Sequence, residues 1–193
     1  MTHIAIFASG SGTNAKAIIR HFRDHPSIKV GLIVTNNPEA GVIKIAHSNK
    51  IISAIISKAF LNDEKRMDQL LRTQTIDFIV LAGFLQYVPE FLLEKFPRRI
   101  INIHPALLPQ HGGKGMFGRK VHEAVLANKE SKTGITIHYV NGQYDAGEVI
   151  MQRKISVKSG DTSESLAARV LSLEHRWYPK IIEKLCTERP LAM

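Results

Sequence analysis

The residue pair with the clearest chemical meaning is Asn102 and His104, at the end of an apolar stretch over residues 100–103. Residues two apart on a β-strand project from the same face, so we expect the amide and the imidazole to point together. An amide N–H can hold a developing oxyanion, and an imidazole can give or take a proton, which suits reaction at a carbonyl carbon. A strand-end histidine that merely bonds a loop carbonyl explains the pattern equally well.

A second candidate is the segment SGSGTN at residues 9–14, which follows an apolar run and opens a helix-like stretch. Glycines let the backbone approach a ligand, and a helix start presents free N–H groups with partial positive charge, so the segment suits a phosphate. It matches neither GxGxxG nor GxxxxGK[ST], which argues against a dinucleotide site or a P-loop. The alternative is a tight turn without a ligand.

Two loops could complete a site around these residues. The turn NGQYDAG at 141–147 contains Asp145, which could orient a histidine or hold a water, or be an ordinary turn residue. The segment at 110–118 has four glycines in seven positions directly after the candidate strand, as expected of a lid or of a plain flexible connection. His138 is expected to be an ordinary core or surface histidine, and no histidines have metal-ligand spacing, so we expect no metal.

Apolar and amphipathic periodicity predicts the elements that must position these residues. Short β-branched runs alternate with helical stretches, which is typical of βαβ units, and the second half adds two alternating strands and a long closing helix. The expected fold is therefore α/β, with three layers: a mostly parallel twisted sheet, helices on both faces, and an antiparallel strand pair near the C-terminal half. The predicted strands are 4–8, 30–34, 54–56, 78–82, 100–103, 134–140 and 147–157, and the predicted helices are 14–22, 62–71 and 163–186.

Composition restricts the classes of protein. The chain has 193 residues, 26 basic and 17 acidic, so its net charge of 26 − 17 = +9 favours anionic partners such as phosphorylated small molecules or nucleic acid. One domain over 1–193 is expected. No apolar run is long enough for a membrane span. The N-terminal residues lack signal-peptide features, and the single Cys186 excludes an intramolecular disulfide, so we expect a cytoplasmic protein.

Taken together, these segments resemble one family. The sequence is similar to the folate-dependent phosphoribosylglycinamide formyltransferases, which formylate glycinamide ribonucleotide in purine synthesis. The resemblance runs from residue 3 to about 182, and NIHPALLP is specific to enzymes that use formyl-folate. The matching segments are SGSGTN at 9–14, VLAGF at 80–84, INIHPALLP at 101–109, GITIHYV at 134–140, YDAG at 144–147 and LEHR at 173–176.

The resemblance implies roles at matching positions and a formyltransferase fold, with a phosphate-binding half (about 1–100) and a folate-binding and catalytic half (about 101–193). It also implies 10-formyltetrahydrofolate as co-substrate, small-molecule partners without nucleic acid or membrane, and a monomer or homodimer. The implied site residues are Asn102, His104 and Asp145 for catalysis; Gly12, Thr13 and Asn14 for the substrate phosphate; Glu174 for the substrate amine or ribose; and Leu85, Gln86, Tyr87, Val88, Asn102, Asn141, Gly142, Gln143, Tyr144 and Asp145 for folate.

The implied reaction is direct attack of the substrate amine on the formyl carbon, through a tetrahedral oxyanion. Asn102 and a protonated His104 would stabilise that oxyanion, and Asp145 would orient His104 and raise its pKa.

The sequence departs from the family in three places. Gln86 stands where better-known members carry an arginine, and the glycine-rich segment is longer than usual. A family arginine near residues 62–66 does not align cleanly, and Lys65 or Arg66 could replace it.

Other functions remain as alternatives. A formyltetrahydrofolate hydrolase or a sugar-nucleotide formyltransferase shares the NIHPALLP segment but fits the SGSGTN loop less well. A methionyl-tRNA formyltransferase would carry a further C-terminal domain. A basic nucleic-acid-binding domain is the most distant alternative, because aromatic residues are not interleaved with basic ones.

Overall fold

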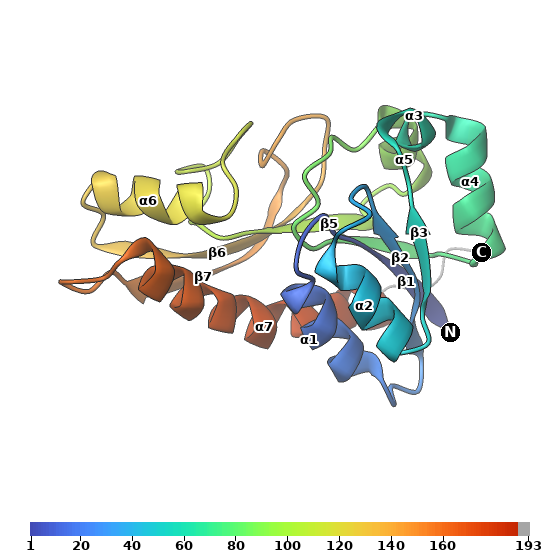
Figure 1. Ribbon diagram of the computed structural model, residues 1–193, viewed down its shortest axis with the longest axis horizontal. Helices are drawn as coiled ribbons and strands as arrows, with labels where there is room; N and C mark the ends of the chain where they lie inside the picture. The colour runs from blue at the N-terminus through green and yellow to red at the C-terminus, as the bar shows by residue number, and fades with distance from the viewer. Residues whose placement is uncertain (189–193) are drawn as a thin grey trace.

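A computed structural model of the chain describes residues 1–188 (Figure 1). The last five residues of the predicted domain, 189–193, lie outside the described residues. The strands are β1 (Thr2–Phe7), β2 (Ile28–Thr35), β3 (Ile52–Ile55), β4 (Phe78–Leu81), β5 (Ile100–His104), β6 (Lys132–Tyr139) and β7 (Val149–Ser156). The helices are α1 (Thr13–Phe22), α2 (Gly41–Ser48), α3 (Lys58–Leu61), α4 (Glu64–Thr73), α5 (Glu90–Lys95), α6 (Arg119–Ala127) and α7 (Ser163–Thr187).

The strands form one seven-stranded sheet in the order β3-β2-β1-β4-β5-β6-β7. Strands β1 to β5 are parallel to their neighbours. Strand β6 is antiparallel to β5, and β7 is antiparallel to β6. This confirms the predicted fold class, including the antiparallel pair in the C-terminal half.

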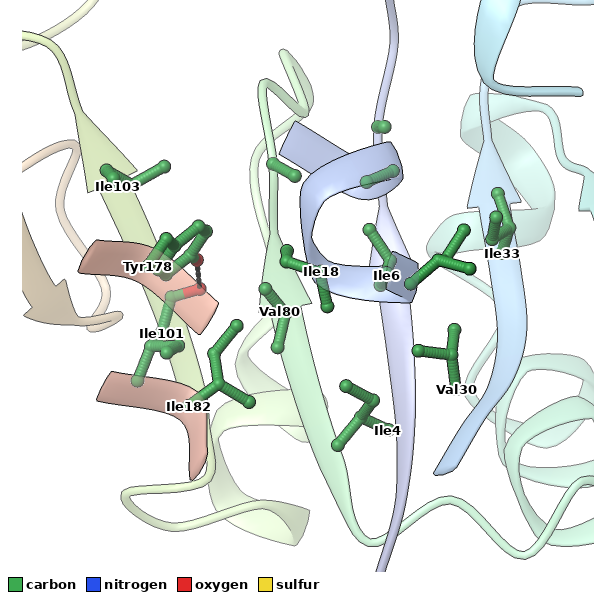
Figure 2. Packing of buried hydrophobic residues seen from close by; sticks show 14 of the residues in the cluster. Ile4, Ile6, Ile18, Val30, Ile33, Val80, Ile101, Ile103, Tyr178 and Ile182 are labelled. Carbon is green, nitrogen blue, oxygen red and sulfur yellow. Dashed lines mark hydrogen bonds between the residues drawn. The ribbon is translucent and has the colours of Figure 1, made fainter. Parts of the chain in front are cut away.

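Alternation along β1 shows why the sheet has helices on both faces. Ile4 and Ile6 pack with buried residues of α1, α2 and α7, whereas Ala5 and Phe7 pack with those of α3, α4 and α5. Successive side chains of a strand point to opposite faces, so an unbroken apolar strand needs cover on both. Figure 2 shows Ile18 of α1 lying over the first of these faces.

Each predicted strand and helix is present, with ends shifted by a few residues. Asp161 and Thr162 were both candidate caps of α7, and the cap is Thr162, whose hydroxyl accepts the N–H of Ser165 in a capping box. Helices α2, α3, α5 and α6 were not predicted. They span only eight, four, six and nine residues and begin at Gly41, after Ser57, after Pro89 and after Gly118, residue types that are typical of loops.

The long helix α7 is fixed to the sheet by Tyr178. Its side chain is fully buried, and its hydroxyl lies within hydrogen-bonding distance of the Leu81 carbonyl at 2.8 Å and the Ile101 carbonyl at 3.2 Å. Figure 2 shows the second contact as a dashed line between α7 and β5. These contacts therefore position α7 against the end of β4 and the first residues of β5.

We expect Tyr178→Phe to lower the free energy of unfolding by about 1–3 kcal/mol, because two buried carbonyls lose their donor. Urea denaturation measures the change. Tyr87→Phe is the matched control, since its hydroxyl donates to the Gly142 carbonyl at an exposed position, and it should cost under about 0.5 kcal/mol. Equal losses in the two variants would contradict an anchoring role for Tyr178.

Candidate active site

A cavity of about 890 Å³ opens where β1, β4 and β5 end. Its walls come from segments that are distant in sequence, among them the loop before α1, the loop after β4, the glycine-rich segment after β5, the β6–β7 turn and helix α7. Open α/β sheets bind ligands outside the carboxyl ends of their strands, and this cavity has that location. Its volume lies at the upper end of the range for small-molecule sites.

Asn102, His104 and Asp145 meet in this cavity. Asn102 Nδ2 donates to Asp145 Oδ1 at 3.3 Å, and His104 Nδ1 lies 3.4 Å from Asp145 Oδ2. Asp145 Oδ2 also accepts the N–H of Gly113 at 2.9 Å. Asp145 adopts a positive φ of 53°, which turns its carboxylate back toward β5. The structure thus brings together the three residues that the sequence suggested for catalysis.

His138 also belongs to this cluster, which the sequence reasoning missed. The antiparallel register pairs His138 with Asn102, and Asn102 Nδ2 donates to His138 Nε2 at 3.2 Å. His138 Nδ1 donates to the Tyr139 carbonyl at 2.8 Å, which assigns its tautomer. The GITIHYV segment showed that His138 lies on a strand, but only the pairing shows what it faces.

Burial and the negative charge of Asp145 oppose each other at His104. The ring is 3% exposed, and this burial lowers the pKa of His104 below its ordinary value despite the attraction of Asp145. Asp145 thus acts on the pKa of His104 in the predicted direction, but burial, which the sequence reasoning did not consider, outweighs it. His104 Nε2 contacts the His111 carbonyl at 2.8 Å, so the simpler interpretation, a strand-end histidine on a loop carbonyl, also describes the ligand-free protein.

Asp145 is held ionised by its surroundings. Burial acts to raise the pKa of Asp145, but His138, His104 and the Gly113 N–H outweigh it and hold the pKa of this carboxyl below its ordinary value. The site therefore combines a carboxylate with a neutral imidazole, a pair able to accept a proton.

The SGSGTN loop leads into α1, as the sequence predicted. Gly12 has φ 77°, and a Cβ there would lie 2.8 Å from the Val42 backbone, so both the conformation and the space require glycine. No side chain caps α1, which leaves the N–H groups of its first turn available. Thr13 and Asn14 line the cavity, whereas Gly12 does not.

Glu174 of α7 lies beside Asn14. Asn14 Nδ2 donates to Glu174 Oε2 at 2.6 Å, and Glu174 is only 7% exposed. Burial raises the pKa of Glu174 to about 7, although the Asn14 hydrogen bond acts in the opposite direction. Close to neutral pH this carboxyl can therefore donate as well as accept.

The segments expected to bind folate form another wall of the cavity. Tyr87 and Tyr144 meet edge to face with ring centroids 5.6 Å apart, and both are partly exposed. The predicted folate residues that line the cavity are Leu85, Gln86, Tyr87, Val88, Asn102, Asn141, Gln143, Tyr144 and Asp145, whereas Gly142 does not. Lys65 and Arg66 are not among the lining residues, and Arg66 stacks on Phe60 instead.

The glycine-rich segment forms a wall of the same cavity. The Met116 N–H donates to the Gly113 carbonyl and closes a tight turn over Lys114 and Gly115. Beyond it, Arg119 and His122 of α6 also line the cavity, and the sequence reasoning did not identify them. They follow the loop on a helix whose existence was not predicted.

No metal site and no membrane span were found in the part of the chain that the structure describes. Within residues 1–188, no three His, Cys, Asp or Glu side chains are grouped so that they could hold a metal ion. No helix in the same range is both long and apolar enough to cross a bilayer.

Comparison with known proteins identifies the family. The sequence model of the formyl transferase family matches residues 2–182. The chain therefore belongs to the formyl transferase family.

Individual relatives are similar over nearly the whole chain. The chain is 42% identical to phosphoribosylglycinamide formyltransferase, chloroplastic, of Arabidopsis thaliana, over 96% of this chain and 66% of that protein. It is 35% identical to phosphoribosylglycinamide formyltransferase of Bacillus subtilis, over 96% of this chain and 95% of that protein. The chain thus spans less than two thirds of the length of the Arabidopsis protein, but almost all of the bacterial one.

Solved structures of proteins with the same name are also similar to this chain. The crystal structure of phosphoribosylglycinamide formyltransferase from Bacillus halodurans superposes with a TM-score of 0.86 and 35% identity, covering 97% of this chain and 96% of that one. The corresponding structure from Anaplasma phagocytophilum gives 0.87 and 33%, covering 96% and 87%.

The raised pKa of Glu174 predicts a dependence of stability on pH. The unfolded carboxyl has a pKa near 4.5 and the folded one a pKa of about 7, so the folded state loses stability as pH rises through this window. Glu174→Gln removes the charge, and we expect it to stabilise the ligand-free protein by up to about 3 kcal/mol at pH 8 and by little at pH 5.

Urea denaturation at the two pH values measures this difference. Glu183→Gln is the matched control, because the hydrogen bond from His21 lowers the pKa of that half-buried carboxyl and no gain is expected at pH 8. If the wild-type protein were as stable as Glu174→Gln at pH 8, ionised Glu174 would cost no stability, and the raised pKa of this carboxyl would be contradicted.

Proposed function

We propose that this protein transfers the formyl group of 10-formyltetrahydrofolate to the amine of 5′-phosphoribosylglycinamide, a step of purine synthesis. The main observation is the Asn102, His104 and Asp145 cluster inside a cavity that also contains the helix start of the SGSGTN loop. Membership of the formyl transferase family and relatives with this name support the same activity.

The ribonucleotide is proposed to bind along α1 and α7. Its phosphate accepts hydrogen bonds from the first turn of α1, where Gly12 gives the backbone its shape and Thr13 and Asn14 face the cavity. Glu174 accepts a hydrogen bond from Asn14 and so lies next to the proposed phosphate site. Its carboxyl can bind the ribose hydroxyls or the amine. This places the reacting amine toward Asn102.

Folate is proposed to bind between the loop after β4 and the β6–β7 turn. The apolar side chains and aromatic rings of Leu85–Val88 and of Tyr144 suit a flat heterocycle, and the polar groups of Asn141–Gln143 suit its ring nitrogens. This wall of the cavity contains Gln86 at the position where the family resemblance implies an arginine, and no arginine lines it among the described residues. No metal ion has a part in this proposal.

The cluster can perform the transfer as follows. The amine nitrogen attacks the formyl carbon, and the former carbonyl oxygen becomes an oxyanion that accepts from Asn102 Nδ2. This donor is available because its 3.3 Å contact with Asp145 is long and easily given up. The proton released by the amine passes to the neutral His104 beside Asp145, whose carboxylate stabilises the resulting imidazolium. That proton then reaches the folate nitrogen as its bond to carbon breaks.

Other features of this proposal concern the whole protein. We infer a single formyltransferase domain, in which residues 1–100 supply the phosphate site and the Leu85–Val88 wall for folate, and residues 101–193 supply the catalytic residues, Glu174 and the other folate wall. A cytoplasmic location, small-molecule partners only, and a monomer or homodimer remain predictions.

A deformylation assay with both substrates tests the function. We expect a signal that requires the ribonucleotide, and we expect Asp145→Asn to lower kcat about 100-fold or more with little change in either KM, because it removes the charge that stabilises imidazolium. Asp24→Asn makes the same change at an exposed position far from the cavity and should have wild-type kinetics. Deformylation without the ribonucleotide would point to a hydrolase, and the absence of any signal would overturn the proposal.

A second variant tests the phosphate subsite. Thr13→Asp puts a negative charge at the start of α1, and we expect the ribonucleotide KM to rise at least tenfold by repulsion while the folate KM stays unchanged. Thr13→Ser keeps the hydroxyl and should leave both constants close to wild type. A ribonucleotide KM unaffected by Thr13→Asp would place the phosphate elsewhere.

A further inference from the structure

Two buried polar atoms in the cavity have no partner. Among residues 1–188, four buried side-chain atoms lack a hydrogen bond, namely Asn14 Oδ1, His122 Nδ1, Thr133 Oγ1 and His175 Nε2. Buried polar groups are almost always satisfied, so each exception calls for an explanation. Asn14 and His122 line the cavity, whereas Thr133 and His175 do not. A ligand would supply what the first two lack.

His122 is the more unusual of the two. It lies on α6 and is 5% exposed, and neither of its ring nitrogens bonds any residue that the structure describes. The other buried imidazoles in the cavity, His104 and His138, have contacts at both nitrogens. No hydrogen bond to a described residue therefore occupies either nitrogen of the His122 ring.

The ring is kept neutral by its surroundings. Burial, and then the proximity of His104, lower the pKa of His122 below its ordinary value. A neutral imidazole has one donor and one acceptor. It therefore suits an uncharged group such as a hydroxyl or an amide better than it suits an anion that needs a full positive charge.

The position of α6 indicates which of the two substrates the His122 imidazole would contact. Helix α6 packs against α7, and Arg119 at its first turn pairs with Glu164 in the first turn of α7 at 2.8 Å. From this contact the cavity wall continues along α7 through Ala168 and Leu171 to Glu174. Figure 1 shows α6 alongside β6 and β7, at the end of the molecule opposite to α3 and α4. Glu174, the residue proposed for the ribonucleotide, is on α7, whereas the folate wall comes from the loop after β4 and the β6–β7 turn.

We propose that His122 is a specificity-determining residue of the ribonucleotide subsite, where its imidazole exchanges a hydrogen bond with a hydroxyl or amide group of the amine-bearing substrate. This inference rests on the proposed function and adds a contact from α6 to the subsite built from α1 and α7.

His122→Leu tests this assignment with two independent readouts. We expect the ribonucleotide KM to rise about three- to tenfold, the usual effect of one neutral hydrogen bond, while the folate KM and kcat stay near wild type. The thermal midpoint of the ligand-free variant should be equal or higher, because an unsatisfied buried group has been removed. His122→Gln, which retains a donor and an acceptor, should recover most of the lost ribonucleotide affinity.

Thr133→Val is the matched control. It removes another buried, unpartnered group with little change of shape, at a position of β6 outside the cavity, so its thermal midpoint should change as in His122→Leu while both KM values stay constant. A ribonucleotide KM unchanged in His122→Leu, or a thermal midpoint lowered by several degrees with both KM values raised alike, would overturn the inference and indicate a structural histidine. A wild-type protein without ribonucleotide-dependent turnover would instead remove the proposed function, and the inference with it.

Discussion

The site depends on the antiparallel pairing of β5 with β6 at the edge of an otherwise parallel sheet. This register sets Asn102 opposite His138, and the turn that follows β6 returns Asp145 to the same point. A parallel neighbour would have needed a long crossover at this point, whereas β6 ends beside Ile101 near the start of β5, and the short turn that follows folds back to bring a carboxylate to Asn102. The positions of the amide, the two imidazoles and the carboxylate therefore follow from one strand pairing.

Around this pairing, the protein keeps several polar groups in states that cost stability. Glu174 is buried with a pKa raised to about 7, His104 is buried close to a carboxylate, and His122 has no partner at all. Such groups destabilise a folded chain unless a ligand satisfies them. Apolar contacts on both faces of the sheet, and the anchoring of α7 by Tyr178, offset these costs. The cavity is thus a pre-formed polar site held by a rigid scaffold.

Much of the fold and the centre of the site were predictable, because they depend on local patterns. Alternation along the strand predicted that Asn102 and His104 share a face, and the SGSGTN loop predicted a helix start with free N–H groups. The role of Asp145 came from the family resemblance, since its turn alone was ambiguous. His138 and His122 could not be found in this way, because a histidine on a strand or helix carries no local signal of what it faces.

The amino-acid sequence by itself determined the order of strands and helices, the class of fold, and the residue types available for carbonyl chemistry. These properties arise from periodicity and backbone preference within a few residues of each position. Only the tertiary structure decided which side chains meet and how they are charged. The pKa of His104 is the clearest example: an aspartate neighbour predicts a rise, but burial lowers it, and burial is a property of the packed chain that no short segment encodes.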